Sequence, residues 1–258
     1  MEPQMNETLS ETNDSEPQLA MPPEAKPGTS VKLAQRLKGP RAQAVVQLRL
    51  GSRAKSASEW RREFLESKLL TEAQLQGIAI VAAEQVTSLI AMTPQAHVDL
   101  THLAPMLIAH AATHLDRPLW GSEAKVMDLS ATQGAPHRCE IARVVGAKRG
   151  AWWEPMSQGE LSPVAQAQLC AVIERGIARQ ALDWGLHLPH PPVLTIVEAG
   201  RPMPIKSISM AASGGKPPFV MARVGLVVEV NLKLRGEWIV GPLRGLGFGR
   251  LVASRWFE

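Results

Sequence analysis

The sequence contains no tyrosine, only two cysteines and no long apolar run. Two cysteines, Cys139 and Cys170, are too few for a disulfide scaffold and are typical of a protein from a reducing cytosol. No apolar stretch approaches the roughly 20 residues that span a bilayer, and the acidic N-terminus lacks the apolar core of a signal peptide. The composition therefore predicts a cytoplasmic protein that is not held together by disulfides.

Several enzyme classes are disfavoured because their motifs are missing. The chain has no Gly-x-Ser-x-Gly elbow, no cysteine in an activating context and no conspicuous carboxylate pair. His110 and His114 are four residues apart, but no glutamate follows His110 to complete a zincin motif, and His137, His187 and His190 lack ligand-like spacing. We therefore expect no metal site and no cofactor.

The charge is divided unevenly along the chain. Residues 1–30 carry six acidic side chains and one basic side chain, whereas the remainder has a net charge of about +9. A basic body favours a polyanionic partner such as nucleic acid, with a solvated surface as the plain alternative. The first 30 residues are rich in Pro, Glu, Ser and Thr and are predicted to be disordered.

The first half of the body predicts one strand followed by helices. Residues 44–50 alternate between apolar and polar side chains, as in a half-buried strand. Capping boxes at Ser56 and Thr71 predict helices over 57–69 and 71–92, and apolar spacing predicts a third helix over 98–115.

The second half predicts a compact α+β unit. Strands are expected over 138–145 and 193–197, extended chain over 203–210, and a helix from Ser162-Pro163 to about residue 184. Residues 223–235 alternate between apolar and mostly polar side chains, which predicts a long half-buried strand. The even-numbered residues from Val224 to Leu234 form the apolar face, and Arg223 lies on the other face. A final strand is predicted over 251–253.

A glycine-rich loop, residues 241–250, separates the last two predicted strands. Its sequence, Gly-Pro-Leu-Arg-Gly-Leu-Gly-Phe-Gly-Arg, is not a Rossmann fingerprint or a P-loop, because no helix follows and the P-loop lysine is absent. Glycines allow close approach of a ligand to the backbone, and arginines supply forked donors for phosphate. The loop therefore predicts contact with a phosphate-rich polymer.

Basic side chains cluster near the first predicted strand, at Lys148-Arg149 and in the glycine-rich loop. We predict that RNA is bound by these groups and by the loop glycines: Arg36, Lys38, Arg41, Lys55, Arg61, Arg62, Lys148, Arg149, Gly245, Gly247, Gly249 and Arg250. Each basic cluster taken alone is more often a solvated face. Trp60, Trp152 and Trp153 could stack on bases, although ordinary partial burial is the favoured interpretation.

The loop at 241–250, between two predicted strands, resembles the C-terminal glycine-rich loop of the RAMP superfamily of CRISPR-associated proteins. More narrowly, the chain resembles the repeat-RNA processing endonucleases of that superfamily, most of all the arginine-rich type IV CRISPR variant with an inserted helical finger. The resemblance rests on the loop over 220–256 and on element order over 138–220. It is weakest over 42–137 and does not cover residues 1–40.

The resemblance implies an α+β fold of two ferredoxin-like (RRM-type) modules with antiparallel sheets and a helical insertion after the first strand. We place the modules at 31–135 and 136–258. It also implies a metal-independent endoribonuclease that binds a CRISPR repeat hairpin, cleaves at the stem base, keeps the guide RNA and joins other effector subunits. The expected partners are therefore repeat RNA, mature guide RNA and those subunits.

Many relatives use a histidine after the first strand, or a tyrosine, and this sequence has neither there. We therefore expect Arg49, Arg53 and Arg244 to align and stabilise the reacting phosphate, with Arg244 opposite the arginines of the first strand. Arginine cannot act as a base, so a distant histidine such as His137 stays open as an acid or base. A non-catalytic RAMP subunit and an RRM-like adaptor for structured RNA are the alternatives.

Overall fold

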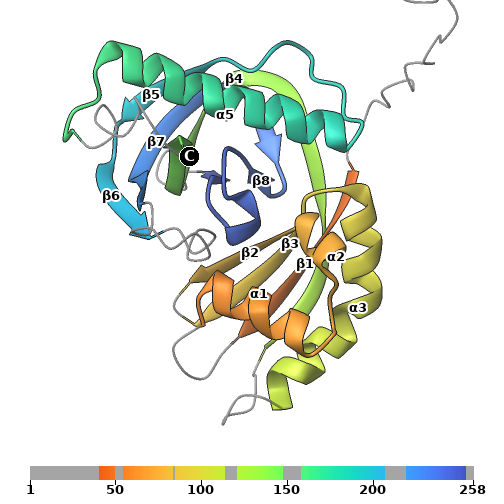
Figure 1. Ribbon diagram of the computed structural model, residues 1–258. Helices are drawn as coiled ribbons and strands as arrows, with labels where there is room; N and C mark the ends of the chain where they lie inside the picture. The colour runs from red at the N-terminus through yellow and green to blue at the C-terminus, as the bar shows by residue number, and fades with distance from the viewer. Residues whose placement is uncertain are drawn as a thin grey trace, which may run out of the picture. The chain divides into compact units, whose positions relative to one another are not determined.

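The computed structural model describes residues 41–49, 55–83, 85–113, 121–147, 158–206 and 219–253, which belong to one compact unit (Figure 1). The predicted disorder of residues 1–30 lies outside this described part. The elements in chain order are β1 (Arg41–Arg49), α1 (Ala57–Glu66), α2 (Glu72–Gln76), β2 (Ile78–Ala83), β3 (Val86–Ala91), α3 (Pro94–Thr113), β4 (Glu123–Ala147), α5 (Pro163–Asp183), β5 (Leu194–Glu198), β6 (Arg201–Lys206), β7 (Phe219–Arg235), β8 (Trp238–Ile239), the 3₁₀ turn η2 (Arg244–Leu246) and β9 (Arg250–Ala253).

The strands of the described residues join in one nine-stranded sheet with the order β2-β3-β1-β4-β7-β5, while β6 pairs with β7 and β9 pairs with both β4 and β8. Every pairing is antiparallel. The predicted antiparallel α+β fold class is thus confirmed. None of the described helices combines the length and the apolar character that crossing a membrane requires.

The first half has the ferredoxin-like arrangement. Apart from the additional short helix α2, its elements follow the order strand, helix, two strands, helix, strand, and the sheet order β2-β3-β1-β4 is the one that this motif produces. Alternate residues of β1 (Ala44, Val46 and Leu48) enter the core with Trp60 of α1 and Leu100 of α3. Accordingly, Figure 1 shows α1 and α3 against the strands of this half.

The predicted helix over 71–92 is wrong beyond its first turn. Its capping box at Thr71 is present, but α2 ends at Gln76, and Ile78–Ala83 pairs with Val86–Ala91 as a hairpin. Several residues of both strands are buried on both faces, so their sequence is nearly continuously apolar rather than alternating. Such a run does not distinguish a strand from a buried helix by period alone.

The second half repeats the arrangement with one change. The pairings give the order β9-β4-β7-β5, and α5 packs on β4, β5 and β8 (Figure 1). Where a second helix is expected between β7 and β9, the chain instead forms β8 and the glycine-rich loop. The predicted boundary at residues 135 and 136 falls inside β4, where the register shifts between Gln133 and His137, so the division into two modules stays a prediction.

Two buried glutamines fix β8, the strand that leads into the glycine-rich loop. Gln43 of β1 donates to the carbonyl oxygen of Glu237 and accepts from its amide, at 3.0 and 2.8 Å. Gln180 of α5 donates to the same carbonyl at 2.9 Å and accepts from the amide of Ile239 at 2.8 Å. Because buried backbone groups need partners, these side chains add to the pairing of β8 with β9 and hold the segment before the loop between β1 and α5.

Arg223 corrects the prediction that it lies on the outer face of β7. Its side chain is fully buried and donates to the carbonyl oxygens of Gln158, Gly159, Ala199 and Gly200 at 2.6 to 2.9 Å. Desolvation lowers the pKa of this guanidinium. The carbonyl dipoles compensate for the buried charge, so Arg223 holds the β5–β6 turn rather than a ligand.

Candidate nucleic-acid interface

The glycine-rich loop is anchored by its apolar side chains. Leu243, Leu246 and Phe248 pack with Val145 of β4 and Ala222 of β7. The 3₁₀ turn η2 at Arg244–Leu246 lies within this segment. The loop is therefore a packed part of the second half, with its backbone turned towards the first half.

Gly247 and Gly249 are required by packing. Gly247 has φ +75°, and a Cβ there would lie 2.6 Å from the carbonyl oxygen of Ile80 in β2. Gly249 has φ +79°, and its Cβ would overlap the carbonyl oxygen of Val240. At Gly245 the nearest atom would be 3.8 Å away, so this position has room for a side chain. RNA contact at the three glycines stays a prediction.

Three of the predicted site arginines gather near the C-terminal end of α5. Arg41 donates to the carbonyl oxygens of Trp184 and Gly185 at 3.2 and 3.4 Å. Arg244 pairs with Asp183, the last residue of α5, at 3.7 Å. Arg250 makes a bidentate pair with Glu237 at 2.6 and 2.7 Å, and the carbonyl of Glu237 is bound by Gln180 of the same helix.

Arg61 approaches the loop from α1. It donates to the carbonyl oxygen of Leu75 at 3.3 Å and pairs with Glu72. A Cβ placed on Gly245 would lie 3.9 Å from its Nη1. The structure thus brings Arg61 and Gly245, which are far apart in sequence, to the same place.

Arg49 lies apart from this cluster. It ends β1, eight residues after Arg41, which corresponds to about 26 Å along a strand. The arginine of the first strand that shares a helix end with Arg244 is therefore Arg41. The remaining predicted basic residues, Arg36, Lys38, Arg53, Lys148 and Arg149, lie outside the described residues.

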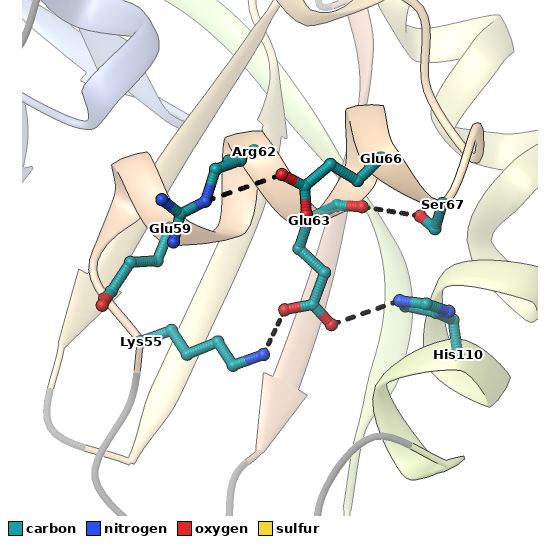
Figure 2. Close-up of a pocket in the computed structure, with 7 residues that line it drawn as sticks. All are labelled: Lys55, Glu59, Arg62, Glu63, Glu66, Ser67 and His110. Atoms are coloured by element: carbon teal, nitrogen blue, oxygen red, sulfur yellow. Dashed lines mark hydrogen bonds and ion pairs between the residues drawn. The ribbon is translucent and has the colours of Figure 1, made fainter.

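A polar pocket of about 460 Å³ lies on another side of α1 and is lined by Lys55, Glu59, Arg62, Glu63, Glu66, Ser67 and His110 (Figure 2). Glu63 pairs with Lys55, and its Oε1 lies 3.2 Å from Nε2 of His110. Burial raises the pKa of Glu63, but the hydrogen bonds and charges of Lys55 and His110 outweigh it, so the net pKa is lowered. Sequence analysis missed this cluster because Glu63 and His110 are 47 residues apart.

The pocket is less suited to phosphate than the end of α5. Three glutamates line it together with the cations Lys55 and Arg62, and Lys55 is paired with Glu63 and lies 5.2 Å from the ring centroid of Trp60. Glu63 is two residues from Arg61, which places the two side chains about 200° apart around α1. RNA that reaches Arg61 and the loop therefore meets the opposite side of this helix. RNA binding by Lys55 and Arg62 stays a prediction.

The pocket predicts a pH-dependent contribution to stability. Because the folded-state pKa of Glu63 is lowered, its carboxylate stabilises the fold above its ordinary pKa of 4.5, and this contribution is lost as the pH falls through the folded-state value. We expect Glu63→Gln to lower the free energy of unfolding at pH 7 by about 1–2 kcal/mol. Urea unfolding should show the difference shrinking below about pH 4.

Glu66→Gln is the matched control, because its pair with Arg62 is long, at 3.9 Å, and exposed. We expect a loss below about 0.5 kcal/mol for this variant. Equal losses for both variants, or a loss at Glu63 that does not change with pH, would contradict the assignment.

The tryptophans, the cysteine Cys139 and the potential metal ligands of the described residues do not form a further site. Trp60 is fully buried rather than partly buried, which excludes stacking on bases, and Trp152 and Trp153 lie outside the described residues. Burial raises the pKa of the Cys139 thiol to about 11, which disfavours a reactive thiolate. Within the described ranges no three His, Cys, Asp or Glu side chains are grouped so as to hold a metal ion.

Similarity to solved structures identifies the fold of this chain. No family model and no curated protein sequence matches the chain. Among solved structures, it is similar to Csf5, a CRISPR-Cas type IV Cas6 crRNA endonuclease, with a TM-score of 0.63 and 17% identity over 83% of this chain and 100% of that one. This chain has a Cas6 fold.

Two further Cas6 structures support this result. A Cas6b structure gives a TM-score of 0.53 at 12% identity, over 83% of this chain and 99% of that one. A CRISPR RNA processing endoribonuclease Cas6b gives 0.50 at 11% identity, over 83% and 100% of the two chains. The chain therefore spans the whole length of these Cas6 structures, and the resemblance noted in its sequence holds at the level of the fold.

Proposed function

We propose that this protein is a metal-independent endoribonuclease that binds the repeat hairpin of precursor CRISPR RNA and cleaves it at the stem base. The observation that carries the proposal is the placement of basic groups at the glycine-rich loop of a Cas6 fold, with Arg41 and Arg244 at the end of α5 and Arg61 next to Gly245. Guanidinium groups bind phosphates through several N–H donors. A basic surface of this kind suits an RNA backbone.

The reaction requires little covalent chemistry from the protein. The 2′-OH attacks the adjacent phosphorus, the bond to the 5′-oxygen breaks, and the products are a 2′,3′-cyclic phosphate and a 5′-OH. The enzyme aligns the attacking oxygen and stabilises the negative phosphorane. We assign the stabilisation to Arg244, and the alignment of the flanking backbone to Arg49 and Arg53.

Proton transfer needs a group other than arginine. His137 stays a candidate; it is partly exposed and lies just after the register shift in β4, opposite Val230. Without a strong acid or base beside the phosphate, the arginines supply mainly electrostatic and positional catalysis. A slow single turnover suffices for an enzyme that retains its guide RNA and carries it to other effector subunits.

The mechanism predicts the response of the RNA to two changes. We expect cleavage of the repeat RNA to continue in EDTA, because no step uses a metal ion, and to stop when the scissile nucleotide is 2′-deoxy, because the nucleophile is missing. Gel analysis of end-labelled RNA measures both, and a phosphatase-resistant 3′ end identifies the cyclic phosphate. Cleavage of the 2′-deoxy RNA, or a requirement for Mg²⁺, would refute the mechanism.

A non-catalytic RNA-binding subunit is the second candidate. It is favoured by the ion pairs of Arg61 and Arg250, which engage these side chains with carboxylates rather than with a reacting phosphate, and by the distance of Arg49 from the cluster. An RRM-like adaptor for structured RNA shares these features. Tight binding of the repeat RNA without any cleavage would select the binding subunit, and equal affinity for unrelated hairpins would select the adaptor.

A further inference from the structure

Asp183 uses its two carboxylate oxygens on two different arginines. Oδ1 accepts from Nε of Arg179 at 2.9 Å, and Oδ2 lies 3.7 Å from Nη1 of Arg244. The pair with Arg179 is an ordinary i,i+4 contact on a helix, but Arg244 comes from the glycine-rich loop. The carboxylate is 15% exposed, whereas Arg179 is 65% and Arg244 33% exposed. Asp183 thus lies beneath two more exposed guanidinium groups and holds them side by side.

Arg41 is fixed next to this pair in a different way. Its guanidinium donates to the carbonyl oxygens of Trp184 and Gly185, the two residues that follow Asp183. Carbonyl groups at the end of a helix lack intrahelical partners and carry the negative end of the helix dipole. They orient the Arg41 side chain without cancelling its formal charge.

The result is a local excess of positive charge with a defined geometry. Three guanidinium groups contact residues 183–185, and the carboxylate of Asp183 balances one of them. Each guanidinium has five N–H donors, and the contacts to Asp183 and to the two carbonyls occupy a minority of these. Planar forks of this kind match phosphate oxygens.

We propose that Arg41, Arg179 and Arg244 form a binding site for backbone phosphates of the RNA, in which Asp183 is the positioning residue. The identity of the ligand rests on the proposed function, since a basic site of this size also fits free phosphate. The site adds Arg179 and Asp183 to the residues expected to contact or position RNA. It extends the binding surface from the glycine-rich loop onto α5.

Asp183→Asn separates positioning from charge, because the two predict opposite results. Removing a negative charge tightens RNA binding if only the net charge matters. We expect weaker binding of the repeat RNA, by about three- to tenfold, because Arg179 and Arg244 lose their common anchor. Fluorescence anisotropy at fixed salt measures the affinity, and thermal unfolding verifies that the variant is folded. Equal or tighter binding by the folded variant would overturn the proposal.

Arg179→Ala and Arg175→Ala form a matched pair. Arg175 lies one turn earlier on α5, and its Nε donates to the carbonyl oxygen of Ala171 at 3.0 Å, so it carries the same charge outside the cluster. We expect Arg179→Ala to weaken binding about fivefold or more and to reduce the salt dependence of the affinity by about one counterion. Arg175→Ala should stay near the wild type. Equal effects of the two substitutions would show that RNA responds to the net positive charge of α5 and not to a specific site, which would contradict the proposal.

Three experimental outcomes distinguish a free-phosphate site, failure of this inference alone and failure of the proposed function. If inorganic phosphate at constant ionic strength raises the Tm of the wild type but not of Asp183→Asn, and RNA affinity is unchanged in Asp183→Asn, the site binds a small anion and the RNA assignment is overturned. If the wild type cleaves repeat RNA but the variants bind normally, the inference alone fails. If the wild type neither binds nor cleaves repeat RNA, the proposed function fails, and the inferred RNA site fails with it.

Discussion

Replacing Arg244 by alanine is expected to slow cleavage of the repeat RNA by about 10²–10³-fold, the cost of removing one preorganised donor to a developing oxyanion. The fold should tolerate the change, because the 3.7 Å pair with Asp183 is long and partly exposed. Such a pair contributes at most about 1 kcal/mol to stability. Single-turnover cleavage with saturating enzyme isolates the chemical step from binding.

Two controls make this result specific. Arg244→Lys keeps the charge but loses the fork, so it should recover only part of the rate if the planar donors matter. Arg175→Ala removes an arginine from the exposed side of α5 and should cleave like the wild type. A rate for Arg244→Ala within about threefold of the wild type would assign phosphorane stabilisation to other groups, because a lost catalytic donor costs far more.

Replacing Gly249 by alanine is expected to lower the free energy of unfolding by about 3 kcal/mol or more, the range of severe backbone strain. The residue has φ +79°, and a Cβ would overlap the carbonyl oxygen of Val240, the residue whose amide donates to the carbonyl oxygen of Gly249. The oxygen belongs to backbone, so no side chain can move aside. For a domain of this size, the loss corresponds to a decrease in Tm of about 6–12 °C.

Gly245→Ala is the control within the same loop. No φ in the left-handed region constrains it, and the nearest atom to its Cβ would be 3.8 Å away. We expect a change in stability within about 0.5 kcal/mol. If RNA passes closest at Gly245, this variant should instead weaken RNA binding while Tm is retained. Equal loss of stability at both positions would contradict the packing described for the loop.

The two halves of the glycine-rich loop have different roles. Gly247 and Gly249 allow the chain to lie against β2 and β8, where a side chain has no space. Arg244 and Gly245 face the side from which Arg61 and Asp183 approach. The loop is therefore a structural join between the two halves of the sheet, and its first half carries the proposed RNA contact.

Local patterns in the amino-acid sequence predict most of the elements and the fold class. Alternation predicted β1 and β7, a short apolar run predicted β9, and the Ser-Pro pair at 162–163 predicted the start of α5, because these patterns are local properties of the chain. The glycine-rich loop carried the resemblance to the RAMP superfamily, and the similarity to Cas6 structures confirms it at the level of the fold. The same local rules failed for β2 and β3, since a strand buried on both faces loses its alternation.

Which charged residues share a site depends on tertiary packing and could not be predicted from local patterns. Asp183 meets Arg244 across 61 residues of chain, Glu63 meets His110 across 47, and Arg223 enters the core, because ion pairs and buried hydrogen bonds depend on which elements pack together. Arg41 rather than Arg49 joins Arg244, since the register of β1 places its first residue at the end of α5. The composition gives the net charge of the chain, but the packing of α5 against β1 and the loop determines where positive charge accumulates.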